Sequence, residues 1–309
     1  MGLKMIIPEK LKKGDTIGVV APSNPITEES LEDINNSIML MESSGFKIEF
    51  GKYVFDNSLG YGASATKKAE DINNMFKNKE IKAIFCASGG ANSNSTFEYL
   101  DYEVIKNNPK ILCGFSDSTS ITNIITKETG LITFNGPTFK ALTSWDTEYG
   151  YKQVIKRFVE GSLELAEENE EFITIKEGKA EGELIGGNLN LTTNMVCGKY
   201  SLKFEGKILF IEELAFESDP AMVSNYLYKM KQNNVFKQIK GLWIGNYEGK
   251  VSLEKIVLDV LEDEEINFPI IKSNNFGHID KKQVIPIGTK ARIDTTKDIK
   301  IELLEKCVK

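Results

Sequence analysis

Hydrophobic positions in the first half of the chain form short apolar runs that alternate with stretches of helical pattern. The first run, residues 15–21 (DTIGVVA), is rich in β-branched side chains and predicts a buried strand. A helix is expected next, because Leu31, Ile34 and Ile38 recur at the three- and four-residue spacing of one helical face. Gly45 marks the end of that helix.

The same alternation repeats as far as residue 134. Further strands are expected at residues 46–50, 81–87, 110–115 and 131–134, with helices near 64–76, 96–106 and 118–128. Apolar strands alternating with amphipathic helices predict an α/β fold with a mostly parallel sheet. Ligands of such sheets bind beyond the carboxyl ends of the strands. We therefore expect a site where these strands end, at residues 21–23, 88–90 and 115–117.

The second half of the chain has a different pattern and predicts a second, smaller β/α domain. A helix over 151–159 is followed by an acidic stretch, 164–183, which we interpret as an exposed connection. The predicted division is therefore a first domain over residues 1–150, a connecting helix and acidic linker over 151–181, and a second domain over 182–309. Strands of the second domain are expected at 207–211, 241–244, 269–272, 285–287 and 291–293, and helices from 220 and over 253–262.

Length and charge agree with this division and exclude several classes of partner. A chain of 309 residues suggests about two domains of roughly 150 residues each. It has 38 basic and 45 acidic side chains, hence a net charge of −7. No block of basic residues stands out, so we expect no nucleic-acid partner and no membrane surface.

The sequence predicts a cytoplasmic protein. No apolar segment precedes Pro8 and Lys10, as a signal peptide would require, and no run approaches the ~18 apolar residues of a membrane span. The four cysteines are scattered without a CxxC pair, and Cys86 and Cys113 lie in strand-like runs. We expect these two to be buried free thiols.

The chain contains a single histidine, His278. One imidazole excludes every chemistry that needs two, such as HExxH metallopeptidase sites or three-histidine zinc sites. We expect no metal and no cofactor. His278 is therefore either an ordinary residue or the sole imidazole of a catalytic site.

The sharpest local feature is the pentapeptide 114–118 (GFSDS), between a predicted buried strand and a predicted helix. This is the context of a nucleophile elbow, in which a tight strand-to-helix turn exposes a serine hydroxyl, here that of Ser116. The next backbone N–H, that of Asp117, lies at a helix N-terminus where it can donate to an oxyanion. The alternative is that Ser116 or Ser118 only caps the helix.

The segment 88–94 (SGGANSN) follows the preceding strand. Its two glycines let the backbone approach a ligand closely, and Asn92 and Asn94 offer donors and acceptors at the strand end. It has neither a GxxxxGK[ST] nor a GxGxxG pattern, so a phosphate cradle is not expected. A flexible turn is the alternative, but beside the elbow this segment is a candidate second wall that supplies another oxyanion-hole N–H.

His278 has the side chain best suited to general-base chemistry near neutral pH. Glu212 is the candidate for orienting it, because it ends the buried run 207–212 (KILFIE), where an unpaired carboxylate is costly. Glu213 should face the opposite way along the strand, so only one of the two is expected to point inward. The alternatives are a surface or core histidine and a solvated strand end. Downstream of the acidic stretch, Asn188 lies in a loop that enters a helix (186–190, GGNLN).

Taken together, these motifs resemble the LD-carboxypeptidase family of serine peptidases. The resemblance rests on an ordered set of motifs from residue 12 to residue 294: GDTIGVVAPS (14–23), GYGAS (60–64), SGGANSN (88–94), GFSDST (114–119), FNGP (134–137), GELIGGNLN (182–190), KILFIEE (207–213) and FGHIDKKQVIPIGTKARID (276–294).

The resemblance implies a catalytic triad with Ser116 as nucleophile, His278 as base and Glu212 orienting it. It also implies oxyanion-hole amides near Gly90 and Asp117. The implied fold is a flavodoxin-like N-terminal domain joined to a smaller C-terminal β/α domain, with the active site between them, in a homodimer.

The segment SGGANSN is similar to the loop of the microcin C immunity-type subgroup. This similarity implies a small peptide or aminoacyl-nucleotide-like substrate, and Asn92, Asn94 and Asn188 are the candidate substrate-binding residues. Members of that subgroup usually carry aromatic residues before GGNL, whereas segment 164–183 has only Phe172. The alternatives are an LD-carboxypeptidase that acts on muropeptides and, from another class, a non-catalytic protein that binds a small ligand.

Overall fold

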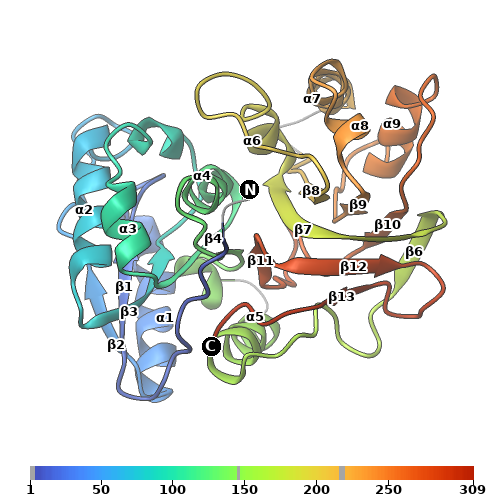
Figure 1. The fold of residues 1–309 in the computed structure, drawn as a ribbon. Coiled ribbons are helices and arrows are strands. Elements are labelled where there is room, and N and C mark those ends of the chain that lie inside the picture. Colours follow the sequence, from blue (N-terminus) through green and yellow to red (C-terminus); the bar gives the residue numbers. More distant parts are fainter. Residues whose placement is uncertain (1–3, 145–146, 216–219) are drawn as a thin grey trace. The chain divides into compact units, whose positions relative to one another are not determined.

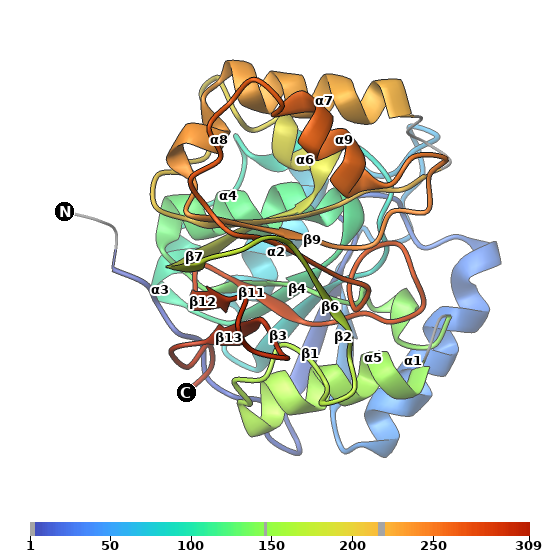
Figure 2. The ribbon, with the colours of Figure 1, turned by 90° about the vertical axis from the view of Figure 1, so that its right-hand side faces the viewer.

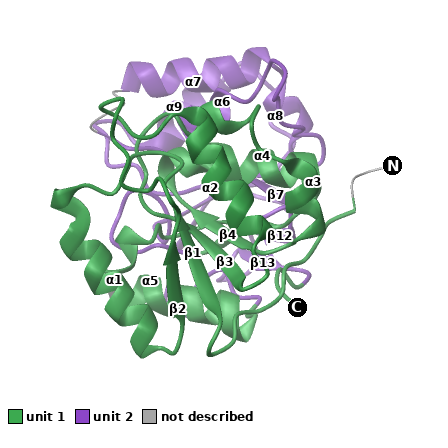
Figure 3. Cartoon of the chain, turned by 90° about the vertical axis from the view of Figure 1, so that its left-hand side faces the viewer, with its two compact units in different colours: residues 1–162, 284–286, 306–309 green, residues 163–283, 287–305 purple. Residues whose placement is uncertain are grey.

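The computed structural model describes residues 4–144, 147–215 and 220–309 (Figure 1). The chain divides into two compact units (Figure 3). Unit 1 contains residues 1–162, 284–286 and 306–309, and unit 2 contains residues 163–283 and 287–305. Each unit has a sheet of its own.

The sheet of unit 1 is built around five parallel strands that follow the predicted pattern. In the order β11-β5-β4-β3-β1-β2, its strands are β1 (Thr16–Val20), β2 (Lys47–Phe50), β3 (Ile81–Cys86), β4 (Ile111–Gly114), β5 (Thr133–Asn135) and β11 (Ile285–Ile287). All pairings among β1 to β5 are parallel. The order 2-1-3-4-5 is the flavodoxin-like arrangement, so the predicted α/β fold is confirmed.

Helices cover both faces of this sheet. The helices α2 (Ala65–Lys77), α3 (Tyr102–Asn107) and α4 (Thr119–Thr129) pack together on one side, and α1 (Leu31–Ser43) and α5 (Thr147–Val154) lie on the other (Figure 3). The region predicted as one helix over 96–106 is instead a 3₁₀ turn, η2 (Ser93–Thr96), followed by α3. The α3 helix begins late because the Asp101 side chain accepts a hydrogen bond from the Val104 N–H at 2.9 Å and caps it there.

The sheet of unit 2 has a parallel centre and antiparallel edges. In the order β13-β12-β7-β8-β9-β10-β6, its strands are β6 (Phe172–Lys176), β7 (Lys179–Asn188), β8 (Ile208–Glu212), β9 (Gly241–Ile244), β10 (Ile270–Ser273), β12 (Lys290–Asp294) and β13 (Ile301–Leu303). Strands β7 to β10 are parallel, whereas β6, β12 and β13 pair in the antiparallel direction. One face carries α6 (Leu189–Thr193), α7 (Pro220–Gln232), α8 (Val235–Gln238) and α9 (Leu253–Val260) (Figure 2).

The boundary between the two units differs from the predicted domain boundary, because unit 1 runs as far as residue 162. Helix α5 and the π-helical turn η5 (Ile155–Glu160) belong to unit 1, because the Arg157 guanidinium donates to the Val284 carbonyl at 3.3 Å and Phe158 is fully buried. The acidic stretch 164–183 is not simply an exposed connection. It contains β6, which pairs with β10, and the beginning of β7.

Aromatic side chains form the centre of each core. In unit 1, Phe158 packs edge-on against Phe134, with ring centroids 4.8 Å apart. In unit 2, Trp243 on β9 packs against Phe276 at 4.6 Å, and Phe276 lies two residues before the single histidine. Cys86 and Cys113 are buried free thiols, as predicted.

Close backbone packing in the centre of the second sheet generates a first prediction. Gly186 on β7 has φ +128°, and a Cβ there would overlap the Phe210 carbonyl oxygen of the neighbouring strand. We expect Gly186→Ala to lower the free energy of unfolding by more than about 3 kcal/mol. Urea denaturation at constant m-value measures the loss.

The matched control is Gly150→Ala in α5, where a Cβ meets nothing within 4 Å. That variant should keep its stability to within about 1 kcal/mol. Equal stabilities for the two variants would contradict the packing described for β7 and β8.

Candidate active site

Ser116 lies on a strained turn between a strand and a helix. Strand β4 ends at Gly114, the 3₁₀ turn η3 (Ser116–Ser118) follows, and α4 begins at Thr119. Ser116 has φ +61°, a left-handed backbone conformation that costs a non-glycine residue about 1–3 kcal/mol. A Cβ at Gly114 would come within 2.6 Å of the Ser118 Cβ, so this turn requires glycine there. This conformation is typical of a nucleophile elbow.

The loop after β3 passes directly beside the Ser116 side chain. A Cβ on Gly89 would lie 3.0 Å from the Ser116 Cβ and 3.3 Å from its Oγ. Gly90 has φ +133°, and a side chain there would overlap the Asn24 amide. The two glycines thus let the backbone approach the hydroxyl, in the position predicted for a second wall.

The Asp117 side chain joins three loops at the carboxyl ends of the strands. It is 2% exposed, and its Oδ2 accepts hydrogen bonds from the Ser23 hydroxyl at 2.5 Å and the Ser93 N–H at 2.8 Å. The Ser93 hydroxyl also donates to the Asp117 carbonyl at 2.8 Å. Because hydrogen bonds to a buried carboxylate are strong, Asp117 fixes the turn on which Ser116 lies.

A buried lysine near Asp117 was not predicted from the sequence. Lys68 on α2 is 2% exposed, and its ammonium has no hydrogen-bond partner in the part of the chain that the structure describes. Burial lowers the pKa of Lys68, and the Asp117 carboxylate opposes that shift. The helical pattern did contain a signal of this burial. Lys68 lies one turn before the apolar Ile72 and therefore on the same buried face of α2.

The two asparagines of the same loop differ in exposure. Asn92 is half-buried, has φ +77° and accepts the Ser95 hydroxyl on its carbonyl at 2.7 Å. Asn94 is exposed. The substrate-binding roles of both residues stay predictions.

In unit 2, Glu212 and His278 form a short hydrogen bond. Glu212 is the last residue of β8 and is 0% exposed, and its Oε2 lies 2.7 Å from the His278 Nδ1. An ionised carboxylate only accepts hydrogen bonds, so in this bond the Nδ1–H donates. Serine hydrolases use a hydrogen-bonded carboxylate–imidazole pair of this kind beside their nucleophilic serine.

Glu213 corrects one expectation, because it is buried as well as Glu212. It is 4% exposed, and its carboxylate accepts hydrogen bonds from the Asn188 side chain and the Asn190 N–H, both at 2.9 Å. The N-terminus of α6 supplies these donors, which explains how an acidic group is tolerated there. Burial raises the pKa of Glu213.

Asn188 is a structural element of this arrangement. It is 3% exposed, and its Oδ1 accepts the Leu191 N–H at 3.2 Å, which caps α6. Its amide nitrogen donates to Glu213. The predicted contact of Asn188 with substrate therefore stays a prediction, beside a capping role that the structure shows.

The loop that carries His278 has little regular structure but is well anchored. Phe276 packs on Trp243, and a Cβ on Gly245 would come within 2.5 Å of the Phe276 ring. The Gln283 N–H donates to the Asn275 carbonyl at 3.0 Å and closes the loop. The Lys282 ammonium lies inside it and donates to backbone carbonyls at 2.8 and 2.7 Å.

Lys282 was also not predicted from the sequence, since a lysine in a polar loop ordinarily faces solvent. It is 2% exposed, and burial lowers its pKa to about 7, while the Glu212 and Asp280 carboxylates oppose that shift. A buried amine that interacts with a buried carboxylate is a common feature of functional sites.

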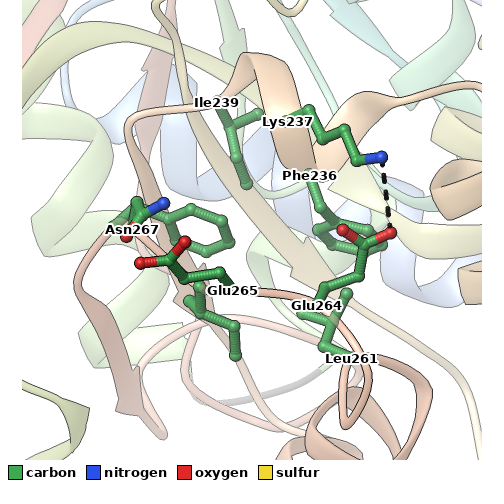
Figure 4. A pocket seen from close by; sticks show the side chains of 9 residues that line it. Phe236, Lys237, Ile239, Leu261, Glu264, Glu265 and Asn267 are labelled. Carbon is green, nitrogen blue, oxygen red and sulfur yellow. Dashed lines mark ion pairs between the residues drawn. The ribbon is translucent and has the colours of Figure 1, made fainter.

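A separate cavity in unit 2 lacks catalytic side chains. It encloses about 310 Å³ and is lined by Phe236, Lys237, Ile239, Leu261, Glu264, Glu265, Ile266, Asn267 and Phe268 (Figure 4). The Lys237 ammonium and the Glu264 carboxylate face each other at 3.6 Å. These residues precede β9 and β10, whereas Glu212 ends the parallel strand β8. The cavity therefore lies at the amino ends of the strands, opposite to the usual site of catalysis.

Among the residues that the structure describes, no helix has the length and hydropathy that a membrane span requires. In the same residues, no three His, Cys, Asp or Glu side chains are grouped as metal ligands.

Unit 1 thus has a serine on an elbow-like turn, and unit 2 has a carboxylate–histidine hydrogen bond; serine peptidases use side chains of these types. Residues 17–136 match the LD-carboxypeptidase N-terminal domain, and residues 181–293 match the LD-carboxypeptidase C-terminal domain. The chain belongs to the LD-carboxypeptidase family and is a peptidase.

Relatives of two kinds resemble almost the whole chain. A probable murein peptide carboxypeptidase of Bacillus subtilis is 31% identical over 93% of this chain and 91% of its own length. The microcin C7 self-immunity protein MccF of Escherichia coli is 28% identical over 94% of this chain and 93% of its own. A structure of MccF in complex with aspartyl sulfamoyl adenosine superposes with a TM-score of 0.87 at 26% identity, over 98% of this chain and all of the other.

The buried Lys282 generates a prediction on pH and stability. Its pKa of about 7 lies below the ordinary 10.5, so between these pH values the unfolded chain holds a proton that the folded chain lacks. The free energy of unfolding should therefore rise with pH over this window through Lys282. Lys282→Met should lose this rise, so the stability of the wild type relative to Lys282→Met should increase from pH 7 to pH 9.

Urea denaturation at both pH values measures the difference. Lys255→Met, at an exposed position on α9, is the matched control and should show a constant difference from the wild type. A constant difference for Lys282→Met as well would contradict the burial of this ammonium.

Proposed function

We propose that the chain hydrolyses an amide or peptide bond through an acyl-enzyme formed on Ser116. His278 acts as general base and Glu212 orients it. The observation that carries this proposal is the 2.7 Å bond between the only imidazole in the chain and a fully buried carboxylate. Ser116 lies in unit 1 and the pair lies in unit 2, so the assembly of the three residues is part of the proposal.

The first half of the reaction forms the acyl-enzyme. The Ser116 Oγ attacks the substrate carbonyl carbon while its proton passes to the His278 Nε2. The backbone N–H groups of Gly90 and Asp117 hold the tetrahedral oxyanion, an effect worth about 2.7–4 kcal/mol per donor. The carbon–nitrogen bond then breaks, and Nε2 returns the proton to the leaving amine.

The second half consumes one water. The His278 Nε2 removes a proton from water, whose oxygen attacks the Ser116 ester and forms a second oxyanion in the same place. The ester bond breaks, the serine oxygen regains the proton, and the carboxylic acid product leaves. Throughout, the Nδ1–H bond to Glu212 stabilises the imidazolium without transfer of that proton.

For the substrate, we propose the immunity type, an aminoacyl-nucleotide or related acyl amide, in contact with Asn92, Asn94 and Asn188. The support is the TM-score of 0.87 with MccF, whose structure contains aspartyl sulfamoyl adenosine. The cytoplasmic location and the homodimer stay predictions.

A muropeptide substrate is the second candidate, and two observations favour it. The probable murein peptide carboxypeptidase is 31% identical over 93% of this chain. In addition, the segment 164–183 offers Phe172 as its one aromatic side chain, and Phe172 is half-buried on β6. This leaves little in that segment to stack on a nucleobase.

The triad generates a prediction on turnover. Ser116→Ala, His278→Ala and Glu212→Gln should each lower kcat by more than about 10³-fold, and combining them should add little, since the three groups act as a unit. The assay is hydrolysis of an acyl amide, with unfolding curves to show that each variant is folded.

Ser118→Ala is the matched control, because Ser118 is the other serine of the turn. Ser118 is the N-cap residue of α4 and is fully buried, so its hydroxyl is not accessible to a substrate. This variant should therefore keep most of its activity. Activity retained in Ser116→Ala and lost in Ser118→Ala would overturn the assignment of the nucleophile.

The choice of substrate generates a separate prediction. Purified protein given aspartyl sulfamoyl adenosine and an L,D-tetrapeptide in parallel should hydrolyse the first with a kcat/KM at least about 10-fold higher. The reverse ratio would assign the protein to muropeptide hydrolysis. Ser116→Ala in both assays shows whether each activity belongs to the proposed site.

A further inference from the structure

One ammonium group holds the backbone on both sides of His278. The Lys282 Nζ donates to the Gly277 carbonyl at 2.8 Å and to the Ile279 carbonyl at 2.7 Å. These two residues directly precede and follow the histidine. The Lys282 side chain thus bridges the Gly277–His278 and Ile279–Asp280 peptide units, which enclose the residue that carries the imidazole.

We propose that Lys282 is a positioning residue for His278, which keeps the imidazole aligned with Glu212 and with its reaction partner. This inference rests on the proposed role of His278 as general base. Lys282 contacts the backbone rather than the reacting atoms, so its effect on catalysis passes through the histidine.

The design of the loop shows why such a bridge is needed. Phe276 anchors the loop on the core before the histidine, and the bond from the Gln283 N–H to the Asn275 carbonyl closes its two ends. Gly277 has φ +126°, a conformation that L side chains rarely adopt, and glycine has more backbone freedom than any other residue. The bonds from Lys282 restrain the part between these anchors, where the histidine lies.

The chemistry of the bridge favours a functional role over a purely stabilising one. A buried ammonium carries a desolvation cost, which the lowered pKa of Lys282 reflects. An apolar side chain of similar volume commonly stabilises a fold as well as a buried charge does. Lysine adds two donors that converge on one short backbone segment, which an apolar side chain does not supply.

The Lys282 side chain also interacts electrostatically with the Glu212–His278 pair. Lys282 interacts electrostatically with Glu212 and Asp280, and Glu212 is the fully buried partner of His278. Lys282 therefore contacts the backbone that carries the imidazole and interacts with the carboxylate that orients it.

The single histidine makes the test direct. In protein labelled with ¹⁵N-histidine, the side-chain signals come from His278 alone, and the Nδ1–H bonded to Glu212 should give one downfield, slowly exchanging proton. In Lys282→Met we expect that proton to broaden or split, and kcat to fall by about 10- to 100-fold with KM within about 3-fold. Lys255→Met should match the wild type in both measurements.

A second variant keeps the test valid if Lys282→Met fails to fold. Lys282→Gln keeps a hydrogen-bond donor, but on a shorter side chain that does not bridge both carbonyls, so it should show the same changes to a smaller extent. A folded Lys282→Met or Lys282→Gln with wild-type imidazole signals and wild-type kcat would overturn the proposal. If the wild type itself hydrolyses no amide, the proposed function fails, while the imidazole signals still test the positioning role.

Discussion

The hydrogen bond between Glu212 and His278 is the interaction on which the arrangement of polar groups in unit 2 depends. A carboxylate with no solvent exposure is stable only where the protein replaces the hydration it has lost. Strand β8 brings Glu212 to the carboxyl end of the parallel centre of its sheet, and the loop after β10 brings the imidazole to within 2.7 Å of it. The same bond fixes which imidazole nitrogen is the donor, and this is what the proposed role of His278 as general base requires.

Unit 1 holds its candidate nucleophile in a different way, through backbone strain balanced by buried polar contacts. Ser116 keeps its left-handed conformation because the loops around it are fixed: Asp117 bonds to Ser23 and Ser93, and Gly89 leaves room for the Ser116 side chain. A strained residue persists only where its surroundings determine it fully. Asp117 in unit 1 and Glu212 in unit 2 are thus alike. Each is a buried carboxylate whose hydrogen bonds hold a neighbouring candidate triad residue in place.

Much of this arrangement could be predicted from the sequence, because its signals are local. The alternation of apolar runs with helical patterns predicted the parallel sheet, and GFSDS, KILFIE and FGHID identified the three candidate triad residues. The two buried lysines were missed, since Lys68 and Lys282 are recognisable only once the fold shows what encloses them. Glu213 was misjudged for a related reason: strand alternation predicts a direction for its side chain, but not the donors at the start of α6 that accept it. The acidic segment 164–183 was assigned to a linker on composition, whereas the pairing of β6 with β10 is a tertiary contact.

The most direct test of the central claim is to locate a covalent adduct. A fluorophosphonate reacts with a serine hydroxyl only where a base has activated it. Peptide mapping by mass spectrometry after this reaction should find one adduct, on the peptide that contains Ser116, and no adduct in His278→Ala. An adduct on another residue, or undiminished labelling of Ser116 in His278→Ala, would contradict the claim that the imidazole held by Glu212 activates this serine.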